Sequence, residues 1–306
     1  MGTNANCLQG FAVKTIIYWG YATAWFLVRH MPEKLAYGLA RFTADQIYRK
    51  NGKQIERLRS NYARVHPEFN QPQLELLVKE GMRSYLRYWC DTFRLPSWNK
   101  EKIKRDVITE NANFLTDPVD AGRGCIVSLP HAGNWDHAGA YFCSLGYKVV
   151  TVAEHLEPEK LFRKFLEYRE TIGMEVLDAS ARSLATLSQR LRAGGLVALV
   201  ADRDLSKSGV NVDFFGFPSR MPVGPAALAL QTGAPLVTAF VSYEPDKIRI
   251  VFQKPIATPA EGTQTEKMAH MIQECADRFA AHIFDRTADW HMLQRIWIDG
   301  DFAERT

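Results

Sequence analysis

The residues best suited to do chemistry stand in one short stretch from Cys125 to Asp136, which reads Cys-Ile-Val-Ser-Leu-Pro-His-Ala-Gly-Asn-Trp-Asp. Its apolar first half predicts a buried strand, and Asn134 can cap a helix that follows. His131 would then lie just beyond the carboxyl end of a strand, where open α/β sheets bind ligands. Asp136, in the first helical turn, can reach back and stabilise a protonated imidazole. The stretch indicates an acid/base pair, and a loop histidine beside a helix-capping acid is the equally open alternative.

Polar residues also follow two other predicted strands. Glu154 and His155 come directly after one of them, and Asp202 follows the buried run Leu-Val-Ala-Leu-Val-Ala. Because parallel strands end at a common edge, we expect these side chains near His131. A carboxylate at the tip of a buried strand is partly desolvated and can hold a histidine by charge, so Asp202 is a second candidate partner for His131. Asp202 can instead cap the following turn. Full activity of an Asp202→Asn variant would exclude Asp202 as the charge partner, and Glu154, at the neighbouring strand end, is then the next candidate.

Other catalytic sites are not favoured by the sequence. His131, Asp136 and His137 are metal-ligand types, but Asp136 and His137 are adjacent and diverge by about 100° on a helix. The Gly-x-Ser-x-Gly elbow, the Gly-x-Gly-x-x-Gly fingerprint and the P-loop are absent. We therefore expect no metal. We expect His131 to act as a general base on a substrate hydroxyl, with backbone amides near the strand tip holding the oxyanion.

The spacing His-x-x-x-x-Asp, spelled His131-Ala-Gly-Asn-Trp-Asp136, resembles the signature of the glycerolipid acyltransferase superfamily. Its form with Gly-Asn-Trp inside resembles the bacterial lipid A acyltransferase branch. The later stretches Ala-Asp-Arg-Asp and Asp-Phe-Phe-Gly look most like the actinobacterial phosphatidylinositol mannoside acyltransferases. The resemblance covers nearly the whole chain, and it implies a glycerol-3-phosphate-acyltransferase-like fold.

The resemblance also implies the substrates. The donor would be a long-chain acyl-coenzyme A, palmitoyl by expectation, and it would serve as co-substrate with no further cofactor. The acceptor would be a mannose hydroxyl of a phosphatidylinositol mannoside, and an acidic residue at the position of Asp202 pairs with the histidine in that family. Arg203 and Arg220 bracket a predicted loop, Leu205 to Met221, and the resemblance implies that this block helps form the acceptor pocket. Our candidates for substrate binding are Glu154, Arg169, Arg203 and Arg220. A lipid A precursor as acceptor, or a membrane-docking protein that binds acyl lipids without turnover, stays open.

Charge is distributed unevenly along the 306 residues, whose formal net charge is +4. Residues 1–110 carry 18 Lys/Arg against 10 Asp/Glu, whereas the remainder carries 20 against 24. A basic and aromatic N-terminal part suggests an anionic membrane face; no nucleic-acid-binding motif appears, and an ordinary solvated surface is the alternative. The five cysteines are scattered and odd in number, which favours a reducing compartment.

The most lipid-like stretch runs from Phe11 to Val28 and is interrupted by Lys14. It is marginal as a membrane span, which needs roughly 20 apolar residues, and its tryptophans, tyrosines and flanking Arg29 are typical of an interfacial helix. We reject cleavage as a signal peptide because no basic segment precedes the apolar run. We expect a protein bound peripherally, or through its N-terminus, to the cytoplasmic face of the plasma membrane. A buried helix packing on the domain is the alternative.

The chain as a whole predicts one α/β domain, 1–306, and a monomer. Residues 1–110 are expected to be helical and to face the membrane, and 111–306 to form the catalytic core. After Glu110, short apolar runs alternate with amphipathic segments, which is typical of a mainly parallel sheet flanked by helices. The strands are expected at Cys125–Leu129, Lys148–Ala153, Met174–Leu177, Leu196–Ala201, Leu236–Tyr243 and Ile248–Lys254. The helices are expected at Pro32–Asn51, Gln54–Val65, Gln71–Trp89, Asn134–Leu145, Glu157–Thr171, Ala181–Ala193, Pro225–Thr232 and Gln264–Phe284.

Overall fold

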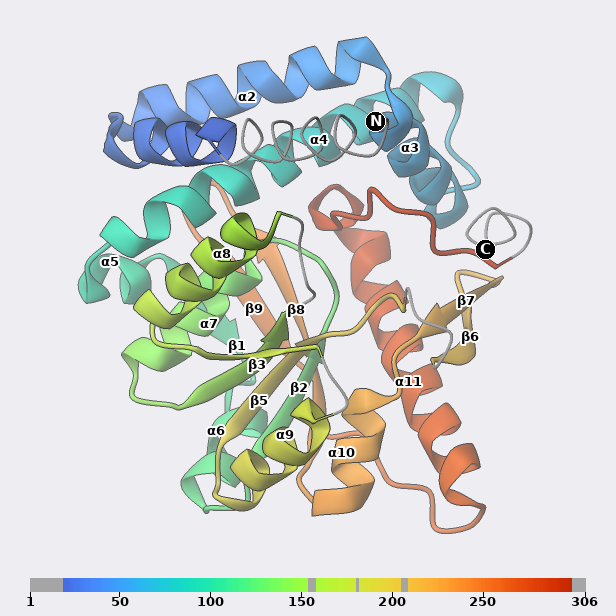
Figure 1. Ribbon diagram of the computed structural model, residues 1–306. Coiled ribbons are helices and arrows are strands. Elements are labelled where there is room, and N and C mark those ends of the chain that lie inside the picture. Colours follow the sequence, from blue (N-terminus) through green and yellow to red (C-terminus); the bar gives the residue numbers. More distant parts are fainter. Residues whose placement is uncertain (1–18, 154–157, 180–181, 205–208, 299–306) are drawn as a thin grey trace, which may run out of the picture.

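A mainly parallel sheet forms the centre of the molecule (Figure 1). The computed structural model describes residues 19–153, 158–179, 182–204 and 209–298. The strands of the sheet are β1 (Val107–Glu110), β2 (Cys125–Leu129), β3 (Val149–Ala153), β4 (Glu175–Asp178), β5 (Leu196–Val200), β8 (Leu236–Tyr243) and β9 (Ile248–Phe252). Their order is β1-β9-β8-β2-β5-β3-β4, and only β8 and β9 pair antiparallel. The predicted fold class is therefore confirmed.

Helices surround this sheet and also lie above it. After a helix at residues 19–30, those that precede it in the sequence are α2 (Glu33–Lys50), α3 (Lys53–Val65), α4 (Gln71–Arg94) and α5 (Lys100–Arg105). Those that alternate with its strands or follow them are α6 (Asn113–Asp120), α7 (Trp135–Ser144), α8 (Glu159–Thr171), α9 (Ser183–Arg192), α10 (Gly224–Thr232) and α11 (Gln264–Asp285). The predicted helices are present, with ends shifted by a few residues.

The sheet is buried on both faces, as the near-continuous apolar runs of its central strands require. Every residue of β2 and β8 is buried. Side chains alternate along β2, so Cys125, Val127 and Leu129 pack on the side of α6 and α7. Ile126 packs on the other side, with side chains of α9, α10 and α11. The core thus consists of two apolar layers separated by the sheet.

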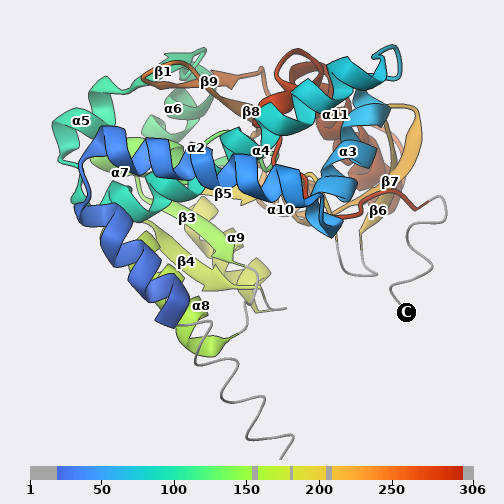
Figure 2. The ribbon, with the colours of Figure 1, turned by 90° about the horizontal axis from the view of Figure 1, so that it is seen from above.

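The N-terminal helices form a separate layer across the carboxyl edge of the sheet (Figure 2). Asp91 of α4 is buried and joins this layer to the core. Its carboxylate accepts hydrogen bonds from Tyr37 of α2 at 2.5 Å, from Tyr243 of β8 at 3.1 Å and from Asn134 at 3.3 Å. A buried carboxylate needs such donors, so these bonds fix α2 and α4 over the end of the sheet.

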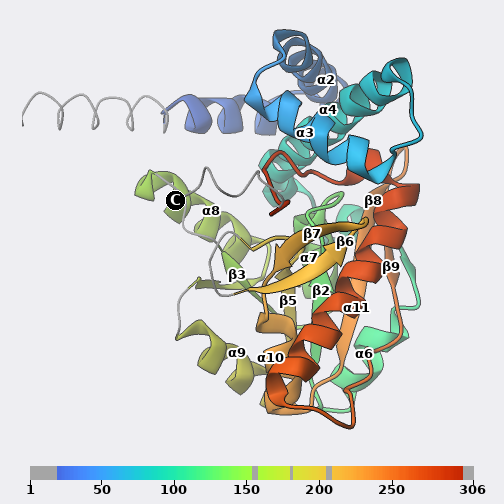
Figure 3. The same cartoon turned by 90° about the vertical axis from the view of Figure 1, so that its right-hand side faces the viewer.

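The segment after α11 returns between the helical layer and the sheet. Trp290 and Trp297 are fully buried. The Tyr62 hydroxyl of α3 donates to the Trp290 carbonyl at 2.8 Å, and Trp290 pairs with Ala132, just after β2. Figure 3 shows this segment above the hairpin of β6 (Val210–Phe214) and β7 (Phe217–Met221), which packs beside α11. The C-terminal segment therefore forms one wall above the carboxyl end of β2.

Two strand features differ from the prediction. The short β1 was not predicted, although it pairs in parallel with β9 at the edge of the sheet. The stretch from Leu205 to Met221 was predicted as a loop, but β6 and β7 form an antiparallel hairpin there. β1 has only four residues, which is too short for a clear alternating pattern. The turn between β6 and β7 contains no Asn-Gly or Asp-Gly pair, so the sequence gives no strong hairpin signal there.

The predicted interfacial stretch from Phe11 to Val28 lies partly outside the described residues. Residues 19–30 are helical. Trp25 is buried against Phe93 of α4 and Tyr168 of α8, at ring distances of 5.0 and 5.5 Å, while Phe26 is 62% exposed. This helix thus packs on the domain with one face and leaves the other uncovered. Within the described part of the chain, no helix has the length and apolar character needed to cross a membrane.

Substituting Gly133 tests the close packing of the turn that follows β2. Its φ is +56°, and a Cβ there would lie 2.5 Å from the Val241 carbonyl oxygen. Gly122 has a similar φ of +72° but open space around it. Gly122→Ala should cost about 1 to 2 kcal/mol from backbone strain alone, and Gly133→Ala about 1 to 3 kcal/mol more because backbone must move. Urea unfolding of both variants measures the difference, and equal losses would contradict the packing described.

Candidate active site

His131 and Asp202 meet at the carboxyl ends of β2 and β5. The Nδ1 atom of His131 lies 2.5 Å from Oδ1 of Asp202, and the His131 backbone N–H donates to Oδ2 at 3.1 Å. The indole Nε1–H of Trp290 donates to the same Oδ2 at 2.8 Å. Asp202 is fully buried, whereas the His131 side chain is 22% exposed. The sequence prediction that Asp202 lies at His131 agrees with this geometry.

The charge on Asp202 follows from its neighbours. Burial alone would raise the pKa of this carboxyl, but the attraction of His131 and the hydrogen bonds from His131 and Trp290 outweigh burial and lower the pKa below its ordinary value. An ionised Asp202 accepts the proton on Nδ1 of His131, which places the lone pair of the neutral imidazole on Nε2. Nε2 has no hydrogen-bond partner among the described residues. His131 therefore presents an uncommitted nitrogen just beyond the carboxyl end of β2.

Asp136 does not hold His131, and that part of the prediction is wrong. Its Oδ2 accepts from the Tyr88 hydroxyl of α4 at 2.9 Å, and its Oδ1 accepts from Nε of Arg169 of α8 at 2.9 Å. Asp136 is buried, so the guanidinium offsets its charge. Both oxygens are directed to neighbouring helices because Asp136 lies inside the first turn of α7. Asp136 thus fixes the start of α7, and only indirectly the loop that carries His131.

Local sequence sets the position of that loop. Asn134 caps α7, since its side-chain oxygen accepts from the His137 backbone N–H at 2.8 Å, as predicted. The backbone N–H groups of His131, Ala132 and Gly133 donate to Asp202, to the Pro130 carbonyl and to the Asp289 carbonyl. The predicted oxyanion site at the strand tip is therefore wrong for these three amides, which are already engaged.

A cavity of about 1000 Å³ opens at His131. One arm runs between the sheet and α6 and α7. Its residues are mostly apolar and include Leu115, Leu129, Ala138, Gly139, Phe142, Ala198, Ala239 and Phe252. A second arm lies on the other face of the sheet, because Val152, Leu187, Leu199 and Leu228 also line the cavity. His131 and Trp135, which follow the carboxyl end of β2, line the same cavity.

The structure places only some of the predicted substrate-binding residues at the cavity. Arg203 and Arg169 line the cavity, and Arg203 also hydrogen bonds to Gln294. Arg169 donates to Asp136, so part of its guanidinium serves the fold. Arg220 lies on the β6–β7 hairpin, where its Nε donates to Asn211 at 3.3 Å, and it is absent from the described lining of the cavity. Glu154, together with His155, lies outside the described residues.

Three aromatic residues at the site were missed by the sequence analysis. Trp290 holds Asp202, and His291 lies beside His131, whose carbonyl accepts the His291 backbone N–H at 2.7 Å. Tyr88 of α4 stacks on Trp135 at a ring distance of 4.1 Å. The only available signal was composition, because no spacing ties the Asp-Trp-His run at 289–291 to the stretch around His131.

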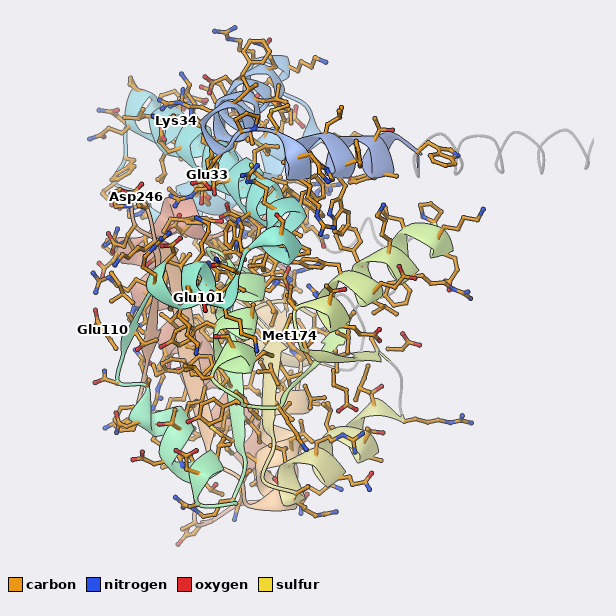
Figure 4. The ribbon with its side chains drawn as sticks, turned by 90° about the vertical axis from the view of Figure 1, so that its left-hand side faces the viewer. Glu33, Lys34, Glu101, Glu110, Met174 and Asp246 are labelled. Carbon is orange, nitrogen blue, oxygen red and sulfur yellow. The ribbon has the colours of Figure 1, made fainter. Side chains whose placement is uncertain are left out.

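His137 belongs to a different environment. Its Nε2 lies 3.0 Å from the Ile103 carbonyl oxygen, and burial lowers the pKa of His137 to about 4. It lines a second cavity of about 920 Å³ on the far side of α4. Glu33, Lys34 and Asp246 also line that cavity, and Figure 4 labels these three residues where α2 passes the turn between β8 and β9. His137 therefore faces away from His131, and the two do not share a ligand.

Comparison with known proteins places the chain among acyltransferases. The family model described as bacterial lipid A biosynthesis acyltransferase matches residues 11–298. A phosphatidylinositol mannoside acyltransferase of Mycolicibacterium smegmatis is 41% identical over 286 residues, covering 91% of this chain and 90% of that protein. A protein of the same name from Mycobacterium tuberculosis is 40% identical over 296 residues, covering 95% and 91%.

Among solved structures, the 1-acyl-sn-glycerophosphate acyltransferase of Thermotoga maritima aligns with a TM-score of 0.37 and 15% identity. The alignment covers 67% of this chain and 87% of that one. The match of the family model over nearly the whole chain and the identity to two full-length relatives agree with each other. The chain therefore belongs to the bacterial lipid A biosynthesis acyltransferase family and is an O-acyltransferase.

Proposed function

We propose that this enzyme transfers a long-chain acyl group, palmitoyl by preference, from acyl-coenzyme A to a mannose hydroxyl of a phosphatidylinositol mannoside. The names of the two relatives support this acceptor. The observation that carries the chemistry is the pairing of His131 with a buried, ionised Asp202 at the mouth of an apolar cavity. Such a pair provides a base at a place where a lipid can enter.

The proposed reaction is direct transfer within a complex of donor and acceptor. The acceptor O–H proton moves to Nε2 of His131 while the hydroxyl oxygen attacks the thioester carbonyl carbon. The tetrahedral intermediate then loses coenzyme A as a thiolate, which takes the proton from His131. The products are an ester and a free thiol. Asp202 stabilises the imidazolium between these two steps, and it needs no proton of its own.

The shape of the apolar arm between the sheet and α7 supports our proposal that the donor has a long acyl chain. It follows the sheet from the level of His131 down to that of Cys125 and Leu196, which pair in register. Six residues of strand correspond to about 20 Å. Small side chains keep this arm open, namely Ala138, Ala198 and Ala239, together with Gly139. An extended acyl chain fits this shape, and its burial would contribute much of the donor's binding energy.

Features of the N-terminal helices support our proposal that the enzyme acts at the surface of an anionic membrane. Leu35, Leu39 and Phe42 form a stripe along α2 and are 59%, 44% and 60% exposed. Their spacing puts them on one face of the helix. Basic residues, including Lys34 and Arg41, stand in the same helix. An exposed apolar stripe with lysine and arginine is typical of a helix that lies at the surface of anionic lipid.

Thiol release from palmitoyl-coenzyme A tests the function. Release should depend on added phosphatidylinositol mannoside, and His131→Asn should lower it by about 10²- to 10⁴-fold. Asp202→Asn should cause a loss in the same range, because an amide N–H facing Nδ1 favours the tautomer whose Nε2 carries the proton. Asp136→Asn is the matched control. It breaks the ion pair with Arg169, so it should lower the melting temperature while reducing the transfer rate less than Asp202→Asn does.

The acceptor is decided in the same assay. The family model also describes lipid A enzymes, so a lipid A precursor is the second acceptor to supply. Release with that precursor alone would replace the mannoside in our proposal. Binding of palmitoyl-coenzyme A without release in the presence of either glycolipid would instead indicate an acyl-lipid-binding protein without turnover.

Filling the apolar arm should shorten the preferred acyl chain. Ala239 lies level with Leu129, near His131, whereas Ala198 lies level with Val127, farther down the arm. Ala239→Leu should therefore restrict the enzyme to shorter chains than Ala198→Leu does. In both variants, palmitoyl transfer should fall at least about tenfold while transfer of a short chain is retained. Rates with a series of acyl-coenzyme A chain lengths measure this, and an equal loss at all lengths would exclude the arm as the acyl site.

Charge on the exposed stripe should weaken membrane binding. Leu39→Glu combined with Phe42→Glu removes apolar area without opening the core, so binding to vesicles of phosphatidylglycerol and phosphatidylcholine should weaken about tenfold or more. Leu145→Glu, at the exposed end of α7, is the control and should bind as the unchanged protein does. Vesicle sedimentation measures both, and unchanged binding of the double variant would place the membrane contact elsewhere.

A further inference from the structure

A second histidine lies beside the catalytic one. His291 is only 6% exposed and lines the same cavity as His131. Its ring packs near those of Tyr85 and Tyr88, at 5.6 and 5.8 Å between ring centroids. Both histidines contact the Trp135 ring, His131 at 5.5 Å and His291 at 6.1 Å. The two imidazoles therefore both lie near one indole in the lining of the cavity.

Hydrogen bonds set the tautomer of His291. The Ser84 hydroxyl donates its one proton to Oδ1 of Asp289 at 2.8 Å, and Oδ2 of Asp289 accepts from the Tyr243 backbone N–H at 2.8 Å. The Ser84 oxygen lies 3.0 Å from Nε2 of His291 and can only accept there, because its proton is already used. Nε2 therefore carries the proton of His291. The other nitrogen, Nδ1, carries a lone pair.

That lone pair has no partner. Nδ1 of His291 is buried and makes no hydrogen bond with any described residue. Burial lowers the pKa of His291 to about 3, so a second proton does not satisfy Nδ1 at neutral pH. A buried acceptor without a donor costs free energy, and native proteins keep few such groups without a reason. Because His291 lines the cavity, a molecule bound there is a source of the missing donor.

We propose that Nδ1 of His291 accepts a hydrogen bond from a second hydroxyl of the acyl acceptor, next to the hydroxyl that His131 deprotonates. This inference rests on the proposed acyl transfer and narrows its acceptor to molecules with neighbouring hydroxyls, such as a sugar ring. Both rings line one cavity and lie near Trp135, so one acceptor with two adjacent O–H groups can meet both nitrogen lone pairs. An acceptor with a single hydroxyl leaves Nδ1 unpaired, so the site discriminates against it. His291 is thus a specificity residue, and the bonds of Ser84 and Asp289 hold its tautomer.

Nitrogen NMR of the protein labelled with 15N-histidine tests the tautomer and the contact without any turnover. In the free enzyme the His291 signal, identified by its loss in His291→Phe, should show a protonated Nε2 and an unprotonated Nδ1. Ser84→Ala should mix the two tautomers. A water-soluble short-chain phosphatidylinositol monomannoside should shift the Nδ1 signal. A proton on Nδ1 in the free enzyme, or an unmoved Nδ1 signal at a mannoside concentration that saturates binding, would overturn the inference.

Deoxy acceptors test the specificity. The enzyme is assayed with the mannoside and with analogues that lack one mannose hydroxyl at a time. For one analogue that still contains the acylated hydroxyl, kcat/KM should fall about tenfold or more in the unchanged enzyme, because removing one partner leaves a buried group unpaired. His291→Phe keeps an aromatic ring at this position but removes the hydrogen-bond acceptor. This variant should therefore use that analogue and the parent mannoside nearly equally well. His66→Phe changes a buried histidine outside the cavity and should discriminate as the unchanged enzyme does.

The NMR experiment and the deoxy-acceptor assay together distinguish a failure of this inference from a failure of the proposed function. If His291→Phe transfers acyl groups and still discriminates against the same analogue, His291 does not read the hydroxyl, although the transfer reaction stands. If the unchanged enzyme transfers nothing to any mannoside, the proposed function fails, and the Nδ1 shift on mannoside binding then decides on its own whether His291 accepts a sugar hydroxyl.

Discussion

The buried negative charge of Asp202 is the constraint on which the site depends. A carboxylate without solvent stays ionised only if donors surround it, and Asp202 has three: the imidazole and backbone N–H of His131, and the Trp290 indole. These donors come from the end of β2 and from the C-terminal segment. The charge therefore requires the loop after β2, the end of β5 and that segment to meet at one point. The same charge holds the imidazole in the tautomer that a base needs.

Two buried carboxylates near His131 have different roles because their partners differ. Asp136 faces the guanidinium of Arg169, whose charge is permanent, so this pair joins α7 to α8 and has no proton to exchange. Asp202 instead faces the imidazole of His131, whose Nδ1 lies 2.5 Å from Oδ1. The acid nearest to His131 in sequence thus joins two helices, and the distant one holds the imidazole.

An apolar cavity also lies against the buried sheet. Ordinary interiors are close-packed, yet an arm of the cavity runs along the central strands. Ala138, Ala198 and Ala239 supply apolar walls with little volume, so the space persists next to a sheet that is otherwise covered. Above it, the helix at residues 19–30 buries Trp25 in the domain and leaves Phe26 exposed. One helical layer can therefore close the top of the core and still present an apolar surface outward.

The sequence by itself determined the central strands, the helices and the position of His131. The short, largely apolar and β-branched run Leu236–Tyr243 favours a buried strand, and Asn134 before Trp135 favours a helix start, so local pattern is enough there. The acyltransferase signature and Asp202 as a candidate partner also came from the sequence. Weakly periodic elements did not: β1 and the β6–β7 hairpin depend on neighbours that pair with them.

Tertiary structure alone decided which acid serves His131 and which residues complete the site. The spacing of five residues favours Asp136, but the direction of a side chain in the first turn of α7 depends on α4 and α8, which pack against it. Trp290 and His291 reach the site because the C-terminal segment pairs with the backbone at Ala132. Periodicity records whether a residue is buried, whereas the partner of a buried polar group is set by long-range packing that leaves no spacing in the sequence.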